Sequence, residues 1–176
     1  MVPKRIREYL SHHDVPYSIR SHPRRIRAQR LAETLHVSGF ELAKSVIFEA
    51  DGEPWIAVAP AAGRVDMERI GEILGTYDIK LLDEITFSRL FPDCEIGAEP
   101  PFGCLFGLPV LMDESLREHL FVSMRAGSHE EIIQMRTADF ERLERPRLGT
   151  FAVLPEKHRY ISTVARGSAT AFRGPA

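Results

Sequence analysis

The sequence contains only two cysteines, Cys94 and Cys104, among 176 residues. This number excludes a disulfide framework and a thiolate zinc site, and it fits a reducing compartment. Cys104 lies beside a glycine-rich loop considered below, where its thiol could be reactive. A small, half-buried side chain is the commoner role for such a cysteine, and we favour it.

Long apolar runs are also missing. No stretch reaches the roughly 18 apolar residues that a membrane-spanning helix needs. Residues 1–7 are basic, but the apolar segment that follows in a signal peptide is not there. We therefore expect a cytoplasmic protein with no membrane contact.

Several nucleotide and catalytic motifs are absent. The sequence has no P-loop, no Gly-x-Gly-x-x-Gly, no His-Glu-x-x-His and no Gly-x-Ser-x-Gly. Its seven histidines show no metal-ligand spacing apart from the adjacent His12 and His13, which are more typical of a surface helix end. We expect neither a metal nor a cofactor.

Charge is distributed unevenly along the chain, although the net charge is only −2. Residues 1–30 contain eight Lys and Arg against two acids, and residues 142–176 contain seven against two, so the middle is acidic. Basic ends fit an RNA backbone, and they equally fit a solvated surface. We predict one domain over residues 1–154 and a basic, poorly ordered tail over residues 155–176.

The clearest local pattern is a hairpin. Two β-rich runs, 43–50 and 54–60, flank Asp51-Gly52, which favours a tight turn. Alternation places Lys44 on the same face as Val46 and Phe48. The remaining predicted strands cover 16–20, 79–82, 108–113, 120–124 and 132–135, and the predicted helices cover 3–13, 28–35, 67–74, 84–91 and 138–143. Asp66, Asp83 and Thr137 are the expected N-caps of the last three helices. This irregular mixture predicts the α+β class.

Two features could form a site. The loop Gly97–Gly103 has a Pro-Pro pair between glycines, which makes it stiff and permits close backbone approach to a ligand. Free N–H groups at its glycine ends could bind a carbonyl or an oxyanion, although a purely structural turn would look the same. Lys44 could anchor a phosphate or polarise a carbonyl, or it could extend to the surface.

Two further features have similar alternatives. In Gly127-Ser128-His129, the histidine could orient water or bind an amine, whereas Ser128 could simply stabilise a turn. Asp113 ends an apolar strand, where it could bind an ammonium group or cap the following turn.

Taken together, these segments resemble the YbaK family, also called the prolyl-tRNA-synthetase-associated editing domain. The resemblance covers about residues 3–152. It rests on six stretches in order: 43–48, 57–60, 91–97, 100–103, 111–116 and 126–129.

The resemblance implies an α+β fold in which a mixed, barrel-like curled sheet is surrounded by helices. It also implies a free-standing deacylase that acts in trans on mischarged tRNA. The substrate would be proline tRNA carrying a small wrong amino acid, and an aminoacyl-tRNA synthetase is a possible partner. The family uses no side-chain nucleophile, because positioned water or the substrate's own 2′-hydroxyl or thiol attacks the activated ester.

The same resemblance assigns residue roles. Lys44 holds the terminal adenosine or its phosphate, and Gly97 and its neighbours contact the aminoacyl carbonyl. The remaining predicted substrate-binding residues are Ser45, Pro100, Pro101, Phe102, Gly103, Asp113, Gly127, Ser128 and His129, with Tyr17 and His22 at the rim. Alanine-specific members often carry Gly-Ala-Asn where this chain has Gly127-Ser-His, so the amino acid removed stays open. A non-catalytic tRNA- or synthetase-binding module and a small-molecule esterase are the alternatives.

Overall fold

The structure is a computed structural model that describes residues 1–24 and 38–155. The predicted helix over residues 28–35 lies outside the described residues, as does all but the first residue of the tail predicted for 155–176. The rest of the predicted domain can be compared with the structure element by element.

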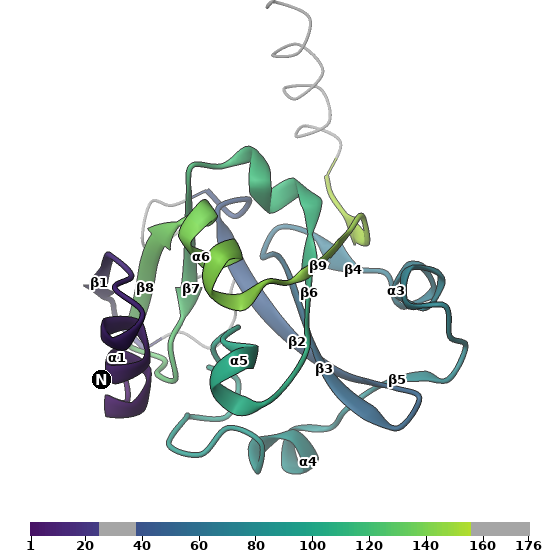
Figure 1. Cartoon of the computed structure of the whole chain (residues 1–176), viewed down its shortest axis with the longest axis horizontal. Helices are drawn as coiled ribbons and strands as arrows, with labels where there is room; N and C mark the ends of the chain where they lie inside the picture. The colour runs from purple at the N-terminus through teal and green to yellow at the C-terminus, as the bar shows by residue number, and fades with distance from the viewer. Residues whose placement is uncertain (25–37, 156–176) are drawn as a thin grey trace, which may run out of the picture.

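The described chain combines helices with one large mixed sheet (Figure 1). Its strands are β1 (Tyr17–Ser21), β2 (Leu42–Ala50), β3 (Glu53–Pro60), β4 (Arg64–Val65), β5 (Ile79–Leu81), β6 (Val110–Asp113), β7 (Phe121–Arg125), β8 (Glu131–Arg136), β9 (Arg147–Gly149) and β10 (Ala152–Val153). Its helices are α1 (Lys4–His12), α3 (Met67–Leu74), α4 (Glu84–Ser88), α5 (Gly103–Phe106), the 3-10 helix η1 (Glu114–Glu118) and α6 (Thr137–Glu144).

The strand order of the large sheet is β1-β8-β7-β2-β3-β6-β9, with β5 added to β2. Strands β4 and β10 form a separate pair. The predicted α+β class is confirmed, as is the mixed sheet with surrounding helices. The sheet is not a closed barrel, because its path ends at β1 and β9, which do not pair with each other.

Strands β2 and β3 form the predicted hairpin. Asp51 and Gly52 have φ values of 52° and 81°, the two positive φ values that a type I′ turn requires. The resulting register pairs Lys44 with Ala59. The sequence therefore determines this hairpin locally, and with it the face to which Lys44 belongs.

The other edge of β2 is shared by two strands. Strand β7 pairs in parallel with Leu42 and Ala43 at its start, and β5 pairs antiparallel with residues 48–50 at its end. Among the described residues, no strand pairs with residues 44–47 on that edge. The loop that follows α4 contacts β2 at this unpaired edge, where the Ser45 hydroxyl bonds to Glu99.

Two hydrophobic clusters cover the sheet from its two sides. The larger one packs α1, α5 and α6 on the sheet through residues such as Ile6 and Phe140. The smaller one packs α3 and the β10 segment on the β2–β3 hairpin, through residues such as Phe48 and Ile70. In Figure 1, α1 and α6 accordingly lie apart from α3, with the hairpin between them.

Helix ends follow the sequence only in part. The Asp66 carboxylate accepts hydrogen bonds from the first turn of α3, as predicted. Asp83 caps α4, but this helix ends at Ser88 rather than near residue 91. The prediction for Thr137 is wrong: it is the first residue of α6, and its hydroxyl donates to the carbonyl oxygen of His119 instead.

None of the helices within residues 1–24 and 38–155 has the length and apolarity of a transmembrane segment. The same residues contain no cluster of three or more His, Cys, Asp or Glu side chains suited to a metal ion.

Candidate functional site

The loop before α5 and the segment after β7 form one hydrogen-bonded unit. The Gly127 N–H donates to the carbonyl oxygen of Ala98 at 2.8 Å, and the Glu95 N–H donates back to the carbonyl oxygen of Gly127 at 3.0 Å. The Ser45 hydroxyl donates to the carbonyl oxygen of Glu99 at 2.9 Å, which attaches the loop to the open edge of β2. Three of the predicted segments therefore meet here.

His129 packs directly against Gly97. A Cβ atom at Gly97 would lie 3.4 Å from His129 Cε1, and it would meet no other residue within 4 Å. His129 Nε2 lies 2.8 Å from the carbonyl oxygen of Ile96. Since a carbonyl only accepts, Nε2 must carry the proton, and in the neutral ring Nδ1 is then an acceptor. Nδ1 is buried and has no hydrogen-bond partner among the described residues.

The polar groups of Gly97 are both engaged in this conformation. Its N–H donates to Glu99 Oε1 at 2.7 Å, and its carbonyl oxygen accepts from Arg125 Nη1 at 2.5 Å. The prediction of a free N–H at Gly97 is therefore wrong for this conformation, because the Glu99 side chain folds back over the loop. Burial raises the pKa of Glu99 and lowers that of Arg125, and the Glu99 charge opposes the second shift.

Lys44 shares a face of the sheet with Arg125. The register pairs Leu42 with Ser123, and Lys44 and Arg125 each follow two residues later, so both side chains point to the same side. Ser45 points to the other side of the strand, and both Ser45 and Arg125 contact the loop, through Glu99 and Gly97 respectively.

The Lys44 ammonium group is half-buried and donates to the carbonyl oxygen of Gly63 at 2.5 Å. Burial lowers its pKa, and within the described part of the chain no carboxylate forms an ion pair with it. An ammonium has three N–H donors, so further donors remain for an anionic ligand.

Residues 100–103, the second half of the loop, anchor it in the core. All four are buried. The Phe102 ring packs between Tyr9 and Phe140 in the larger cluster. A Cβ atom at Gly103 would lie 2.2 Å from the carbonyl oxygen of Leu108. Phe102 and Gly103 therefore have structural roles in the core and in the following turn, and their contacts with a ligand stay predictions.

Asp113 also has a structural role. Its carboxylate accepts hydrogen bonds from the Ser115 N–H and hydroxyl, and from the N–H groups of Phe151 and Ala152 at 2.8 and 2.6 Å. The side chain is buried, with 1% of its surface exposed. The structure supports the capping alternative rather than an ammonium site, so we leave Asp113 out of the candidate site.

The remaining predicted residues lie at different distances from this unit. Ser128 is buried; its hydroxyl accepts from the Glu130 N–H and from the Met1 ammonium group, each at 3.2 Å. The His22 N–H donates to the carbonyl oxygen of Glu130, so His22 adjoins the segment of His129. Tyr17 lies at the other end of β1, on a separate hollow, and the structure does not bring it to Gly97.

Two residues of the unit were missed by sequence reasoning. Glu99 is a carboxylate with 8% of its surface exposed, in a loop of glycine and proline. Arg125 is a half-buried cation at the end of an apolar strand. A charged residue in an apolar stretch was the available signal in both cases, as it was for Lys44.

Comparisons with known proteins agree with this geometry. The model of the aminoacyl-tRNA editing domain matches residues 22–143. The hypothetical protein APE2540 superposes with a TM-score of 0.77 at 15% identity, over 85% of this chain and 100% of its own. A candidate trans-editing enzyme for prolyl-tRNA synthetase superposes with a TM-score of 0.74 at 17% identity, over 85% and 96% respectively. A comparison with curated proteins gave no match.

Identities this low show a shared fold, whereas the family model shows more. It spans well over half of the chain and includes Lys44, the Gly97 loop and His129. The resemblance inferred from the sequence is thereby confirmed, and the chain belongs to the aminoacyl-tRNA editing domain family.

Proposed function

We propose that this chain is a deacylase that acts in trans and hydrolyses the ester between a wrong amino acid and the 3′ end of tRNA. The observation that carries the proposal is the hydrogen-bonded unit of Gly97, Gly127 and His129 beside the Lys44 strand, within a chain of the editing-domain family. The substrate we propose is proline tRNA carrying a small amino acid. Such substrate is present in the cytoplasm, where we expect the protein to act.

The reaction needs little from side chains because an aminoacyl ester is already activated. Water attacks the carbonyl carbon, the C–O bond to the ribose breaks, and the products are the free amino acid and the tRNA with its hydroxyl restored. The site must bind the ester, orient water and stabilise the developing oxyanion. No covalent intermediate on the protein is required.

Each residue has a role that its surroundings allow. Lys44 is half-buried, lies on the same face as Arg125, and contributes positive charge for the terminal adenosine or its phosphate. Because Gly97 has no side chain, we propose that the aminoacyl group approaches its backbone beside the His129 ring. In the reactive complex, we propose that the Gly97 N–H turns from Glu99 to the ester oxygen.

The test is hydrolysis of a panel of mischarged tRNAs, beginning with proline tRNA charged with alanine and with cysteine. Wild type should release a small amino acid, and Lys44→Ala should lose most of this activity. Lys80→Ala is the matched control, because Lys80 is exposed on β5 and paired with Glu49.

Absence of hydrolysis for every aminoacyl-tRNA would refute the enzyme and leave the non-catalytic binding module. Equal rates in wild type and Lys44→Ala would refute the role of Lys44. Hydrolysis of a free aminoacyl ester as fast as of the tRNA ester would instead identify a small-molecule esterase.

A further inference from the structure

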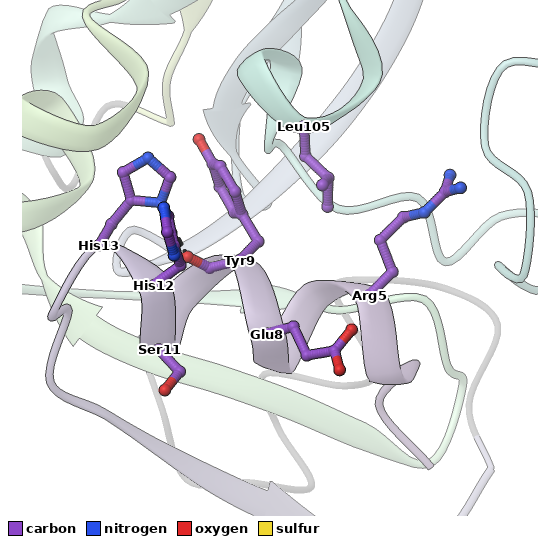
Figure 2. A pocket seen from close by; sticks show the side chains of 7 residues that line it. All are labelled: Arg5, Glu8, Tyr9, Ser11, His12, His13 and Leu105. Atoms are coloured by element: carbon purple, nitrogen blue, oxygen red, sulfur yellow. Dashed lines mark hydrogen bonds between the residues drawn. The ribbon is translucent and has the colours of Figure 1, made fainter.

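The exposed side of α1 forms one wall of a hollow of about 510 Å³ (Figure 2). Arg5 lies at one end of the hollow, His12 and His13 lie at the other, and Tyr9 and Leu105 lie between them. Arg5 and His12 are seven positions apart on the helix, about 10 Å along its axis. The deacylation mechanism described above uses none of these side chains.

Positive charge predominates on this helix. Lys4, Arg5 and Arg7 are exposed, and Glu8 is the single acid within α1. Glu8 lines the hollow together with Arg5, and its carboxylate pairs with Lys4 at 3.3 Å. No carboxylate forms an ion pair with Arg5 among the residues that the structure describes. The His12 imidazole adds an N–H donor at the far end. The His13 Nδ1 donates to the carbonyl oxygen of Tyr9 at 2.8 Å, so in the neutral ring its Nε2 is an acceptor.

The floor of the hollow is rigid. The Tyr9 hydroxyl donates to Glu144 Oε1 at 2.9 Å, and the buried Glu144 carboxylate also accepts from the Cys104 N–H at 2.8 Å. These bonds join α1 to α5 and α6. The Tyr9 ring lies 4.7 Å from the His13 ring, which orders the histidine end. Donors on a fixed surface lose less conformational entropy when a ligand binds.

Helix α1 also begins at the candidate site. Its N-cap, Pro3, lies against Gly127, where an added Cβ atom would be 2.8 Å from the proline ring. The thiol of Cys94, which precedes the Gly97 loop, lies 3.1 Å from the same Cβ position. The helix has nine residues and is about 14 Å long, so the hollow along it begins next to the candidate site.

We infer that the exposed side of α1, from Arg5 to His13, binds the phosphate backbone of the tRNA acceptor arm. This inference rests on the proposed function, because it is the ester at the RNA 3′ end that places the adjoining phosphates over the helix. The ligand is recognised by charge and carries no sequence information at this surface. The chain has a net charge of −2, so this local basic surface is what attracts RNA.

The experiment measures binding of uncharged tRNA by fluorescence anisotropy at 50–200 mM salt. It compares wild type, Arg5→Ala and the triple variant Arg5→Ala/His12→Ala/His13→Ala. We expect Arg5→Ala to reduce the slope of log K against log salt by about one. The triple variant should bind tRNA at least about tenfold more weakly than wild type. Lys80→Ala, which removes an exposed charge on β5, should bind like wild type.

Kinetics provide the second readout. The ratio of kcat/KM for aminoacyl-tRNA to that for 3′-aminoacyl-adenosine should fall in the triple variant, and it should not fall in Lys80→Ala. Circular dichroism and urea unfolding establish whether each variant is folded. If the triple variant does not fold, the single variant Arg5→Glu takes its place in both measurements.

Wild-type tRNA affinity and an unchanged ratio in folded variants would overturn the inference. If no ester is hydrolysed by wild type, the proposed function fails, while the salt dependence of tRNA binding still tests the surface separately.

Discussion

The His129 ring borders the position that a side chain at residue 97 would occupy. A Cβ atom there would lie 3.4 Å from His129 Cε1, and Gly97 has a φ of +83°. The two residues are 32 positions apart, and hydrogen bonds between their segments fix this arrangement. The first prediction concerns this arrangement.

Gly97→Ala should cost about 1 kcal/mol of unfolding free energy, because alanine is strained at positive φ. It should also reduce deacylation at least tenfold, because the methyl group occupies the proposed aminoacyl position. Gly52→Ala is the matched control: Gly52 has φ +81° but nothing within 4 Å of its Cβ position. Urea unfolding and deacylation rates separate the two effects. The space assigned to the substrate is wrong if both variants retain full activity.

Asp113→Ala should destabilise the fold by roughly 3 kcal/mol, because buried N–H groups of Phe151 and Ala152 lose their acceptor. Ser115→Ala, which removes only the hydroxyl donor, should cost about 1 kcal/mol or less. Activity per folded molecule should stay near wild type in both. If Asp113→Ala kept wild-type stability and lost activity, Asp113 would belong to the candidate site after all.

These residues show how far the sequence leads. The β2–β3 hairpin and the Asp66 cap are specified within a few residues, so local patterns predict them. Asp113 accepts bonds from a segment 38 and 39 residues away, and Arg125 reaches Gly97 across 28 residues. Such contacts depend on how strands are ordered in the sheet, which no local pattern contains. Family resemblance therefore identified the motifs. The structure then showed that Ser45 and His129 bond to the Gly97 loop and the residue before it, whereas Phe102, Gly103 and Asp113 have structural contacts.

Lys44 should leave a signature in the pH dependence of stability. Burial lowers the pKa of Lys44 in the folded chain, so between this value and the ordinary one, about 10.4, the unfolded chain binds more protons. The unfolding free energy of wild type should therefore rise relative to Lys44→Met as pH increases through that window. Urea unfolding at pH 8 and pH 10 measures the difference.

Lys80→Met is the control for this measurement. Its hydrogen bond and ion pair with Glu49 raise the pKa of Lys80, so the stability that this shift contributes is present up to about pH 10.4 and is lost only above it. The unfolding free energy of wild type relative to Lys80→Met should therefore stay nearly constant between pH 8 and pH 10. A fall in the unfolding free energy of wild type relative to Lys44→Met with increasing pH would show that the ammonium is not buried in solution.

Glu99→Gln tests the carboxylate that folds over Gly97. Burial raises the pKa of Glu99 above its ordinary value, about 4.3, in the folded chain. The stability that this shift contributes is present below pH 4.3 and is lost as pH rises through the folded-state pKa. Glutamine does not titrate, so its stability relative to wild type should increase from pH 4 to pH 7. Urea unfolding across this range gives the sign directly. Asp83→Asn should show little trend over the same range, because its hydrogen bonds to Thr86 lower the pKa of Asp83 and the resulting stability is lost only below about pH 3.9.

The same variant should also act on the reaction. An amide oxygen is a weaker acceptor than a carboxylate, so Glu99→Gln holds the Gly97 N–H less tightly and leaves it more available to the ester oxygen. We therefore expect kcat for deacylation at pH 7 to increase relative to wild type. A large decrease in a variant of normal stability would mean that the Glu99 charge itself binds the substrate, for which the α-ammonium group of the amino acid is the chemical match.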